Sequence, residues 1–173
     1  GPSNDHVRCE HFGGHVLDVG CGTGLSGIAL RDAGFINQDG CDFSPSMLKR
    51  AAETDIYQRL FIADLNEGLG TADETYDAAA AVGVFSFGHI QPSALRKILR
   101  VVRPDSAVVI GLNDHFWELG TLAAELRRAP FGHRHHGRCL RAGRRGNRRP
   151  HLRHTQNHAW LATTREIRGP LRW

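Results

Sequence analysis

The chain has 173 residues, a formal net charge of +4 and four cysteines. This length is enough for one domain with a hydrophobic core. No run of about 18 apolar residues is present, so we expect neither membrane contact nor a signal peptide. The cysteines form no Cys-x-x-Cys pair, so we expect reduced thiols in a cytoplasmic protein, and no metal site.

Positive charge is concentrated in the C-terminal part of the chain. Residues 129–173 hold 11 arginines and one acid, a net charge of +10, whereas residues 1–128 have a net charge of −6. The C-terminal residues lack apolar periodicity, apart from a strand-like run at 159–163, so we expect a largely disordered basic tail. Three interpretations of this tail remain. It binds RNA, it holds a metal ion, which the spacing of its His and Cys residues disfavours, or it is an out-of-frame stretch of sequence.

Between residues 15 and 128, strand patterns alternate with helix patterns, after a short lead-in of residues 1–14. Strands are expected at 15–19, 35–42, 57–63, 76–84 and 107–112, and helices at 25–33, 45–54, 92–102 and 114–128. Ser44-Pro45 marks a helix start and Arg103–Ser106 a turn. This alternation predicts an α/β fold of the Rossmann type, with a doubly wound, mainly parallel sheet and an incomplete C-terminal part.

A glycine-rich turn follows the first predicted strand. The strand ends at Val19, glycines occupy alternate positions after it, and a helix begins at Leu25. Glycine permits a positive φ and lets the backbone approach a ligand, while the start of a helix offers unpaired N–H groups. The turn therefore predicts a site for a small ligand, with contacts from Gly20, Cys21, Gly22 and Gly24.

Asp18 helps to distinguish two classes of ligand. Gly22-x-Gly24-x-x-Gly27 formally matches a dinucleotide fingerprint, in which a pyrophosphate lies at the start of the helix. A carboxylate at position 18 would repel phosphate but favour an ammonium or sulfonium group. We therefore count Asp18 among the cofactor contacts and keep a nicotinamide-dependent oxidoreductase as the alternative.

Three further polar residues follow the ends of predicted strands. Ligands of parallel α/β sheets bind outside the carboxyl ends of the strands, where Asp42, Asp64 and His89 are expected to lie. Asp42 suits the two hydroxyls of a ribose, or else interacts only with the start of the following helix. Asp64 is either a turn residue or a ligand contact.

Four segments resemble, in order, the motifs of class I S-adenosylmethionine-dependent methyltransferases of the type 11 kind. They are VLDVGCGTG at 16–24, DFSPSML at 42–48, YDA at 76–78 and LRKILRVVRPD at 95–105. The stretch through Gly83 and His89 also resembles methyltransferases related to the Williams–Beuren region protein. The family usually has two glycines after the proline at position 104, and this chain has Asp105-Ser106 instead.

The resemblance implies S-adenosylmethionine as cofactor and an in-line transfer of its methyl group. It implies that Asp64 accepts a hydrogen bond from the adenine amino group and that the Leu65 N–H meets a ring nitrogen. Phe43, Met47 and Val82 complete the expected cofactor contacts. The protein would act mainly through alignment, worth ~7–11 kcal/mol, with His89 as the candidate general base or simply a loop residue.

The expected partners follow from the same resemblance. We expect a small-molecule acceptor and no membrane, with nucleic acid contacted at most non-specifically through the basic tail. A non-catalytic module that binds the cofactor or RNA is a third hypothesis. The acceptor and the oligomeric state cannot be deduced from the residues.

Overall fold

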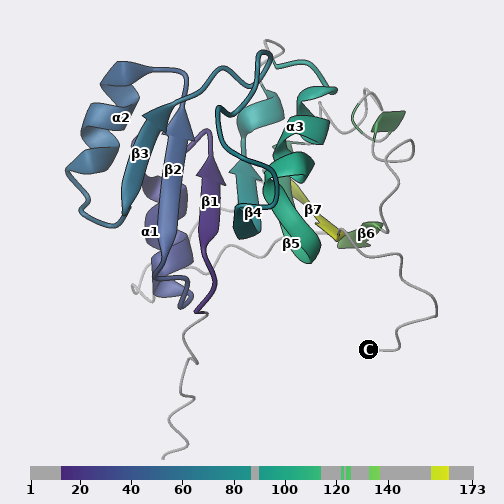
Figure 1. Ribbon diagram of the computed structural model, residues 1–173, viewed down its shortest axis with the longest axis horizontal. Helices are drawn as coiled ribbons and strands as arrows, with labels where there is room; N and C mark the ends of the chain where they lie inside the picture. Colours follow the sequence, from purple (N-terminus) through teal and green to yellow (C-terminus); the bar gives the residue numbers. More distant parts are fainter. Residues whose placement is uncertain are drawn as a thin grey trace, which may run out of the picture.

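The computed structural model describes residues 13–86, 90–113, 122, 124–125, 133–136 and 157–163. A seven-stranded sheet runs through it in the order β3-β2-β1-β4-β5-β7-β6 (Figure 1). Five of its strands are parallel neighbours: β1 (Val16–Val19), β2 (Gln38–Asp42), β3 (Arg59–Ile62), β4 (Tyr76–Val82) and β5 (Val102–Asn113). The predicted fold class, a Rossmann-like and mainly parallel sheet, is confirmed.

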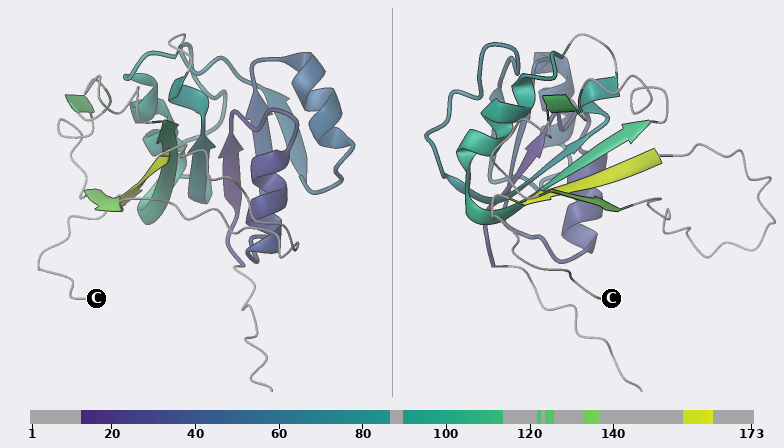
Figure 2. Two further views of the ribbon diagram at one scale, coloured as in Figure 1. Left: turned by 180° about the vertical axis from the view of Figure 1, so that it is seen from behind. Right: turned by 90° about the vertical axis from the view of Figure 1, so that its right-hand side faces the viewer.

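Within the described residues, three helices and a short 3-10 turn pack on this sheet: α1 (Leu25–Asp32), α2 (Pro45–Ala52), α3 (Ala94–Val101) and η1 (Val84–Ser86). Helices α1 and α3 lie on opposite faces of the sheet (Figure 2). Helix α2 begins as predicted, because Pro45 occupies its first turn and the Ser44 hydroxyl accepts a hydrogen bond from the Met47 N–H at 3.4 Å. No helix among the described residues is long and apolar enough to cross a membrane.

The core lies mainly between β1, β4, β5 and helix α3. One face of α3 is buried against the sheet, with side chains from Ala94, Leu95, Ile98, Leu99 and Val101. A smaller apolar cluster of Cys21, Leu48 and Ala51 lies under α2, with Tyr57 and Leu60 packed against it. The periodic apolar positions of the sequence therefore form the interior, as expected for a doubly wound sheet.

Strand β5 differs from its prediction. It begins at Val102, directly after α3, whereas a turn was expected at Arg103–Ser106. The pairing with β4 passes from Tyr76 opposite Val102 to Ala78 opposite Ala107, so residues 103–106 form an irregularity within the strand rather than a separate turn. The proline and polar residues that suggested a turn occupy this irregularity.

Two stretches of the basic C-terminal part join the sheet. Strand β7 (Asn157–Thr163) pairs antiparallel with β5, and β6 (His133–His136) pairs antiparallel with β7. The strand at 159–163 is thus present and two residues longer than predicted. The sequence did not indicate β6, because His-Arg-His-His has no apolar alternation. The domain boundary after residue 128 stays a prediction, and most of the helix expected at 114–128 lies outside the described residues.

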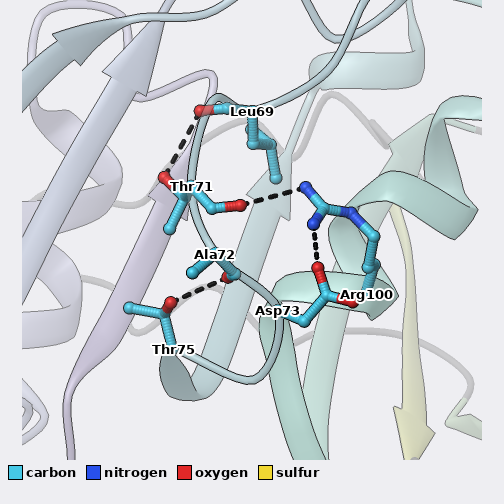
Figure 3. A network of polar contacts seen from close by, with 6 residues as sticks. All are labelled: Leu69, Thr71, Ala72, Asp73, Thr75 and Arg100. Carbon is cyan, nitrogen blue, oxygen red and sulfur yellow. Dashed lines mark hydrogen bonds and ion pairs between the residues drawn. The ribbon is translucent and has the colours of Figure 1, made fainter.

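The connection between β3 and β4 is held against α3 by polar contacts (Figure 3). The Arg100 guanidinium donates to the Thr71 carbonyl oxygen at 3.0 Å and forms an ion pair with Asp73. The Thr71 and Thr75 hydroxyls donate to carbonyl oxygens within the same connection. Because Asp73 and Arg100 are exposed, their ion pair adds little stability, but the contacts define the path of a segment that leaves the ligand side of the sheet.

We expect strand β7 to show slow amide hydrogen exchange in the full chain. Its residues 159–162 lie between β5 and β6, so both edges of this stretch are paired. Peptides that cover 157–163 should exchange more slowly than an unstructured peptide of the same sequence, with peptides from β1 as an internal reference for a central strand. Exchange at the unstructured rate would contradict the pairing of β7 with β5.

Candidate active site

A cavity of about 490 Å³ opens at the carboxyl ends of β1, β2 and β4. This volume falls within the range of sites for small ligands, roughly 300–1,000 Å³. Its position agrees with the rule for open α/β sheets. The lining residues are Gly20, Gly22, Cys41, Asp42, Phe43, Ser44, Met47, Ala63, Leu65, Val82, Gly83, Val84 and Ile90.

More than half of the predicted cofactor contacts line this cavity: Gly20, Gly22, Asp42, Phe43, Met47, Leu65 and Val82. Four others do not line it: Asp18, Cys21, Gly24 and Asp64. His89 lies outside the described residues. Sequence reasoning missed the lining residues Cys41, Ser44, Ala63, Gly83, Val84 and Ile90. Several of these are immediate chain neighbours of predicted contacts, so the strand-end signal alone could have found them.

The glycine turn adopts the left-handed conformation that its composition suggested. Gly20, Gly22 and Gly24 have φ values of 64°, 54° and 92°. A β-carbon added at Gly20 would lie 2.6 Å from Val84 Cγ2, whereas one added at Gly22 would meet no atom within 4 Å. Gly20 is therefore needed for packing, and Gly22 leaves open space beside the backbone in the cavity wall.

Asp42 joins the glycine turn to the start of α2. Its Oδ2 accepts a hydrogen bond from the Gly22 N–H at 2.9 Å, and its Oδ1 accepts one from the Ser44 N–H at 2.8 Å. Both interpretations of this residue thus have a structural basis, since it contacts the backbone before α2 and also lines the cavity. A carboxylate offers about four acceptor positions, so two remain for the hydroxyls of a ligand.

Asp18 is buried and is not among the residues that line the cavity, and its contact with the cofactor stays a prediction. The residue is 0% exposed. Its carboxylate accepts hydrogen bonds from the Ser26 hydroxyl at 2.7 and 2.9 Å and from the Tyr57 hydroxyl at 2.6 Å. Burial raises the pKa of the Asp18 carboxyl, and the hydrogen bonds from Tyr57 and Ser26 oppose that rise. Asp18 thus supports the glycine turn through hydrogen bonds on its buried side.

Two buried thiols lie at the turn, Cys21 within it and Cys41 beside it on β2. Burial, reinforced by the charge of Asp18, raises the pKa of the Cys21 thiol to about 12, and burial raises the pKa of Cys41 to about 12. Both groups are therefore neutral at physiological pH and are poor nucleophiles. Their contribution to the site is apolar packing.

Asp64 occupies a turn rather than the cavity wall. Its Oδ1 accepts a hydrogen bond from the Asn66 N–H at 2.8 Å, the geometry of an Asx turn. The structure gives Asp64 the role of a turn residue, and its contact with the adenine amino group stays a prediction. The neighbouring Leu65 does line the cavity, so the turn at Asp64 places the side chain that follows it.

The rim of the cavity is apolar and exposed. Phe43 and Val82 are 69% and 54% exposed, and Met47 is also exposed. Large exposed apolar side chains around a concave site are typical of a surface that a ligand covers. Across the part of the chain that the structure describes, no group of three or more His, Cys, Asp or Glu side chains could hold a metal ion.

The mainly parallel sheet, the left-handed glycine turn and the acid at the end of β2 define a class I S-adenosylmethionine-dependent methyltransferase fold. The family described as "Methyltransferase domain" matches residues 16–105, more than half of the chain, and the chain belongs to this family. The predicted family and its cofactor, S-adenosylmethionine, are thereby confirmed.

Curated relatives match only part of their own length. Human methyltransferase-like protein 27 is 40% identical over 96 residues, which cover 55% of this chain and 39% of the relative, and it fits the predicted likeness to the Williams–Beuren region group. The 18S rRNA (guanine-N(7))-methyltransferase of Bos taurus is 38% identical over 68 residues, 39% of this chain and 24% of the relative. The malonyl-[acyl-carrier protein] O-methyltransferase of Pseudescherichia vulneris is 37% identical over 93 residues, 54% and 36% of the two chains.

Solved structures share the fold at low sequence identity. The methyltransferase in complex with the Haloferax volcanii Trm112 methyltransferase activator gives a TM-score of 0.69 at 18% identity, covering 93% of this chain and 86% of that chain. A TehB-like S-adenosylmethionine-dependent methyltransferase from Corynebacterium glutamicum gives 0.68 at 21% identity, covering 90% and 83%.

The predicted partners need correction. We expected only a small-molecule partner, with nucleic acid contacted at most non-specifically through the basic tail. Several relatives are named as methyltransferases of 18S rRNA, and one structural neighbour was solved with a protein activator. The prediction was wrong because it took the acceptor from a resemblance that covers only the cofactor-binding part of the family.

Substitution at Gly20 and Gly22, the two glycines of the turn that line the cavity, should separate folding from binding. Gly20→Ala places a methyl group against Val84 at a left-handed φ, so we expect a loss of about 1–3 kcal/mol in the free energy of unfolding, measured with urea. Gly22→Ala adds only backbone strain, about 1 kcal/mol, but fills space in the cavity and should weaken binding of S-adenosylhomocysteine. Wild-type affinity in a folded Gly22→Ala protein would mean that the ligand does not contact this turn.

Proposed function

We propose that this chain binds S-adenosylmethionine in the cavity at the ends of β1, β2 and β4 and transfers its methyl group to an acceptor. The observation that carries the proposal is the hydrogen bond from the Gly22 N–H to the Asp42 carboxylate. It places a left-handed glycine turn and a carboxylate with spare acceptor positions in the wall of one cavity. Membership of the methyltransferase domain family supports the same conclusion.

Each part of the cofactor has matching residues in the wall. Asp42 would hold the ribose hydroxyls through its free acceptor positions, and the apolar side chains of Phe43, Met47 and Leu65 suit the adenine ring. The glycine turn would face the methionine part, where the carboxylate of Asp42 favours a cationic ligand. When bound, the cofactor supplies an electrophilic methyl group on a sulfonium.

The chain itself contributes orientation and exclusion of water. Val82 and Gly83 lie at the end of β4, beside the turn, and with Val84 they form an apolar wall of the cavity. Such a wall limits the positions that the cofactor can adopt, and alignment of donor and acceptor is the main source of rate in an in-line transfer. The general base at His89 and the cytoplasmic location stay predictions.

The acceptor depends on parts of the protein other than the cofactor cavity. The names of the relatives include an rRNA guanine and a malonyl group on a carrier protein, and these two relatives match only 39% and 54% of this chain. The region that matches the methyltransferase domain family is residues 16–105. We infer that this region carries the methyl donor site shared by these proteins and that acceptor recognition lies elsewhere. No described contact supports the small-molecule acceptor that the resemblance implied.

Calorimetry with S-adenosylhomocysteine tests the donor site through Asp42→Ala. Loss of hydrogen bonds to a charged group should weaken binding by ~1.5–3 kcal/mol, roughly 10- to 100-fold. Asp77→Ala is the matched control, because Asp77 also accepts a backbone hydrogen bond, from the His15 N–H at 2.7 Å, but does not line the cavity. NAD should not bind detectably to the wild-type protein.

Either of two results would contradict the proposal. Wild-type protein that binds NAD but not S-adenosylhomocysteine would favour the nicotinamide alternative. Equal affinities for wild-type and Asp42→Ala proteins, with both folded, would remove Asp42 from the ribose position.

A further inference from the structure

The slot behind the glycine turn holds a tyrosine that the described function does not use. The ring of Tyr57, in the segment between α2 and β3, passes close to Gly24, Gly27 and Gly40. A β-carbon at Gly27 would lie 2.2 Å from the Tyr57 hydroxyl oxygen, and one at Gly40 would lie 3.0 Å from Tyr57 Cε1. The slot therefore exists only because glycines from the turn, from α1 and from β2 leave room for this ring.

At the end of the slot, the tyrosine meets a buried carboxylate. Its hydroxyl donates to Asp18 Oδ2 at 2.6 Å, and the Ser26 hydroxyl donates to both oxygens of the same carboxylate. Ser26 belongs to the first turn of α1, and Asp18 to the end of β1, so this hydrogen bond joins the two ends of the glycine turn. Among the described residues, Tyr57 is the only side chain from outside the β1–α1 unit that donates a hydrogen bond to Asp18.

We propose that Tyr57 is a positioning residue for binding of the methyl donor. Together with Ser26, Tyr57 holds the buried carboxylate of Asp18 and so keeps the turn from Gly20 to Gly24 in the shape that binds the donor. This inference rests on the proposed binding of S-adenosylmethionine. It also gives Gly27, the third glycine of the dinucleotide-like pattern, a role other than pyrophosphate binding. Its missing β-carbon admits the Tyr57 hydroxyl to Asp18.

The physical basis is the cost of burying a carboxylate. Asp18 is fully buried in the centre of the sheet, between β2 and β4, and a buried polar group needs hydrogen-bond partners. Removal of the Tyr57 hydroxyl leaves Oδ2 with Ser26 as its one remaining side-chain donor. The backbone hydrogen bond at Gly27 remains, but the lost donor can be replaced by water only if the end of β1 or the start of α1 moves. Either movement changes the turn that faces the cavity.

The chain offers a matched control at the opposite end of the sheet. The Tyr76 hydroxyl donates to Asp39 Oδ2 at 2.9 Å, and both residues are buried. Tyr76→Phe therefore removes the same kind of hydrogen bond from a tyrosine to a buried aspartate. Neither residue lines the cavity, so this variant reports the general loss of stability without a change in the turn.

The test measures the affinity for S-adenosylhomocysteine by calorimetry between about pH 5 and pH 8. Tyr57→Phe should bind about tenfold more weakly at neutral pH, because a hydrogen bond to a charged group is lost. Tyr76→Phe should bind as tightly as the wild type, even if both variants lose similar thermal stability. Ser26→Ala, at a half-buried position, should weaken binding in the same direction and serves if Tyr57→Phe does not fold.

The pH profile separates a positioning role from simple loosening of the fold. The Tyr57 hydroxyl lowers the pKa of Asp18, so Tyr57→Phe should shift the acid loss of affinity to higher pH. Cys21, Cys41 and Tyr57 stay neutral in this range because burial raises their pKa values, and Asp42 is retained in every variant. General loosening would instead weaken binding by the same factor at every pH.

The outcomes distinguish failure of the proposed function from failure of the positioning role of Tyr57. If the wild type does not bind S-adenosylhomocysteine, the proposed function fails, and this inference fails with it. If the wild type binds and Tyr57→Phe binds equally well, or with an unshifted pH profile, the positioning role alone is wrong. An equal loss of affinity in Tyr76→Phe would also overturn it.

Discussion

The hydrogen bond between the Gly22 N–H and the Asp42 carboxylate couples the first two strands at the ligand side of the sheet. It spans 20 positions in the sequence, and it ties a turn with left-handed glycines to the end of β2, whose Asp42 also accepts from the Ser44 N–H just before α2. Because the turn has no side chains of its own at Gly20 and Gly22, its shape depends on such contacts from neighbouring segments. The cavity is therefore a product of strand register as much as of the glycines.

The three acids that follow or end the first three strands have three different environments. Asp42 lines the cavity, Asp64 closes an Asx turn, and Asp18 is buried behind the glycine turn. All three were expected to contact the cofactor: Asp18 because of its charge, Asp42 because of its place at a strand end, and Asp64 because of the resemblance to the methyltransferase family. Strand ends bring residues to one edge of a sheet, but the local backbone decides whether a side chain faces the ligand, the solvent or the interior.

The two strands beyond β5 illustrate the same limit of prediction from the local sequence. Antiparallel β7 extends the sheet beyond β5, and β6 extends it once more. The sequence indicated β7 through the short run Ala159–Thr163, but it did not indicate β6, whose residues lack an apolar pattern. Backbone hydrogen bonds hold strands of this kind, and they can form from almost any residue type once an unpaired strand edge is available.

The sequence by itself determined the order of strands and helices up to β5, the glycine turn, the family and most of the cavity residues. These features depend on periodicity, glycine conformation and helix capping, all of which act within a few residues. Only the tertiary structure decided the place of Asp18, because its burial depends on Tyr57, 39 residues further along the chain, and on a slot lined by glycines from three segments. Contacts between such distant segments leave no local pattern, so they become visible only when the strands are assembled.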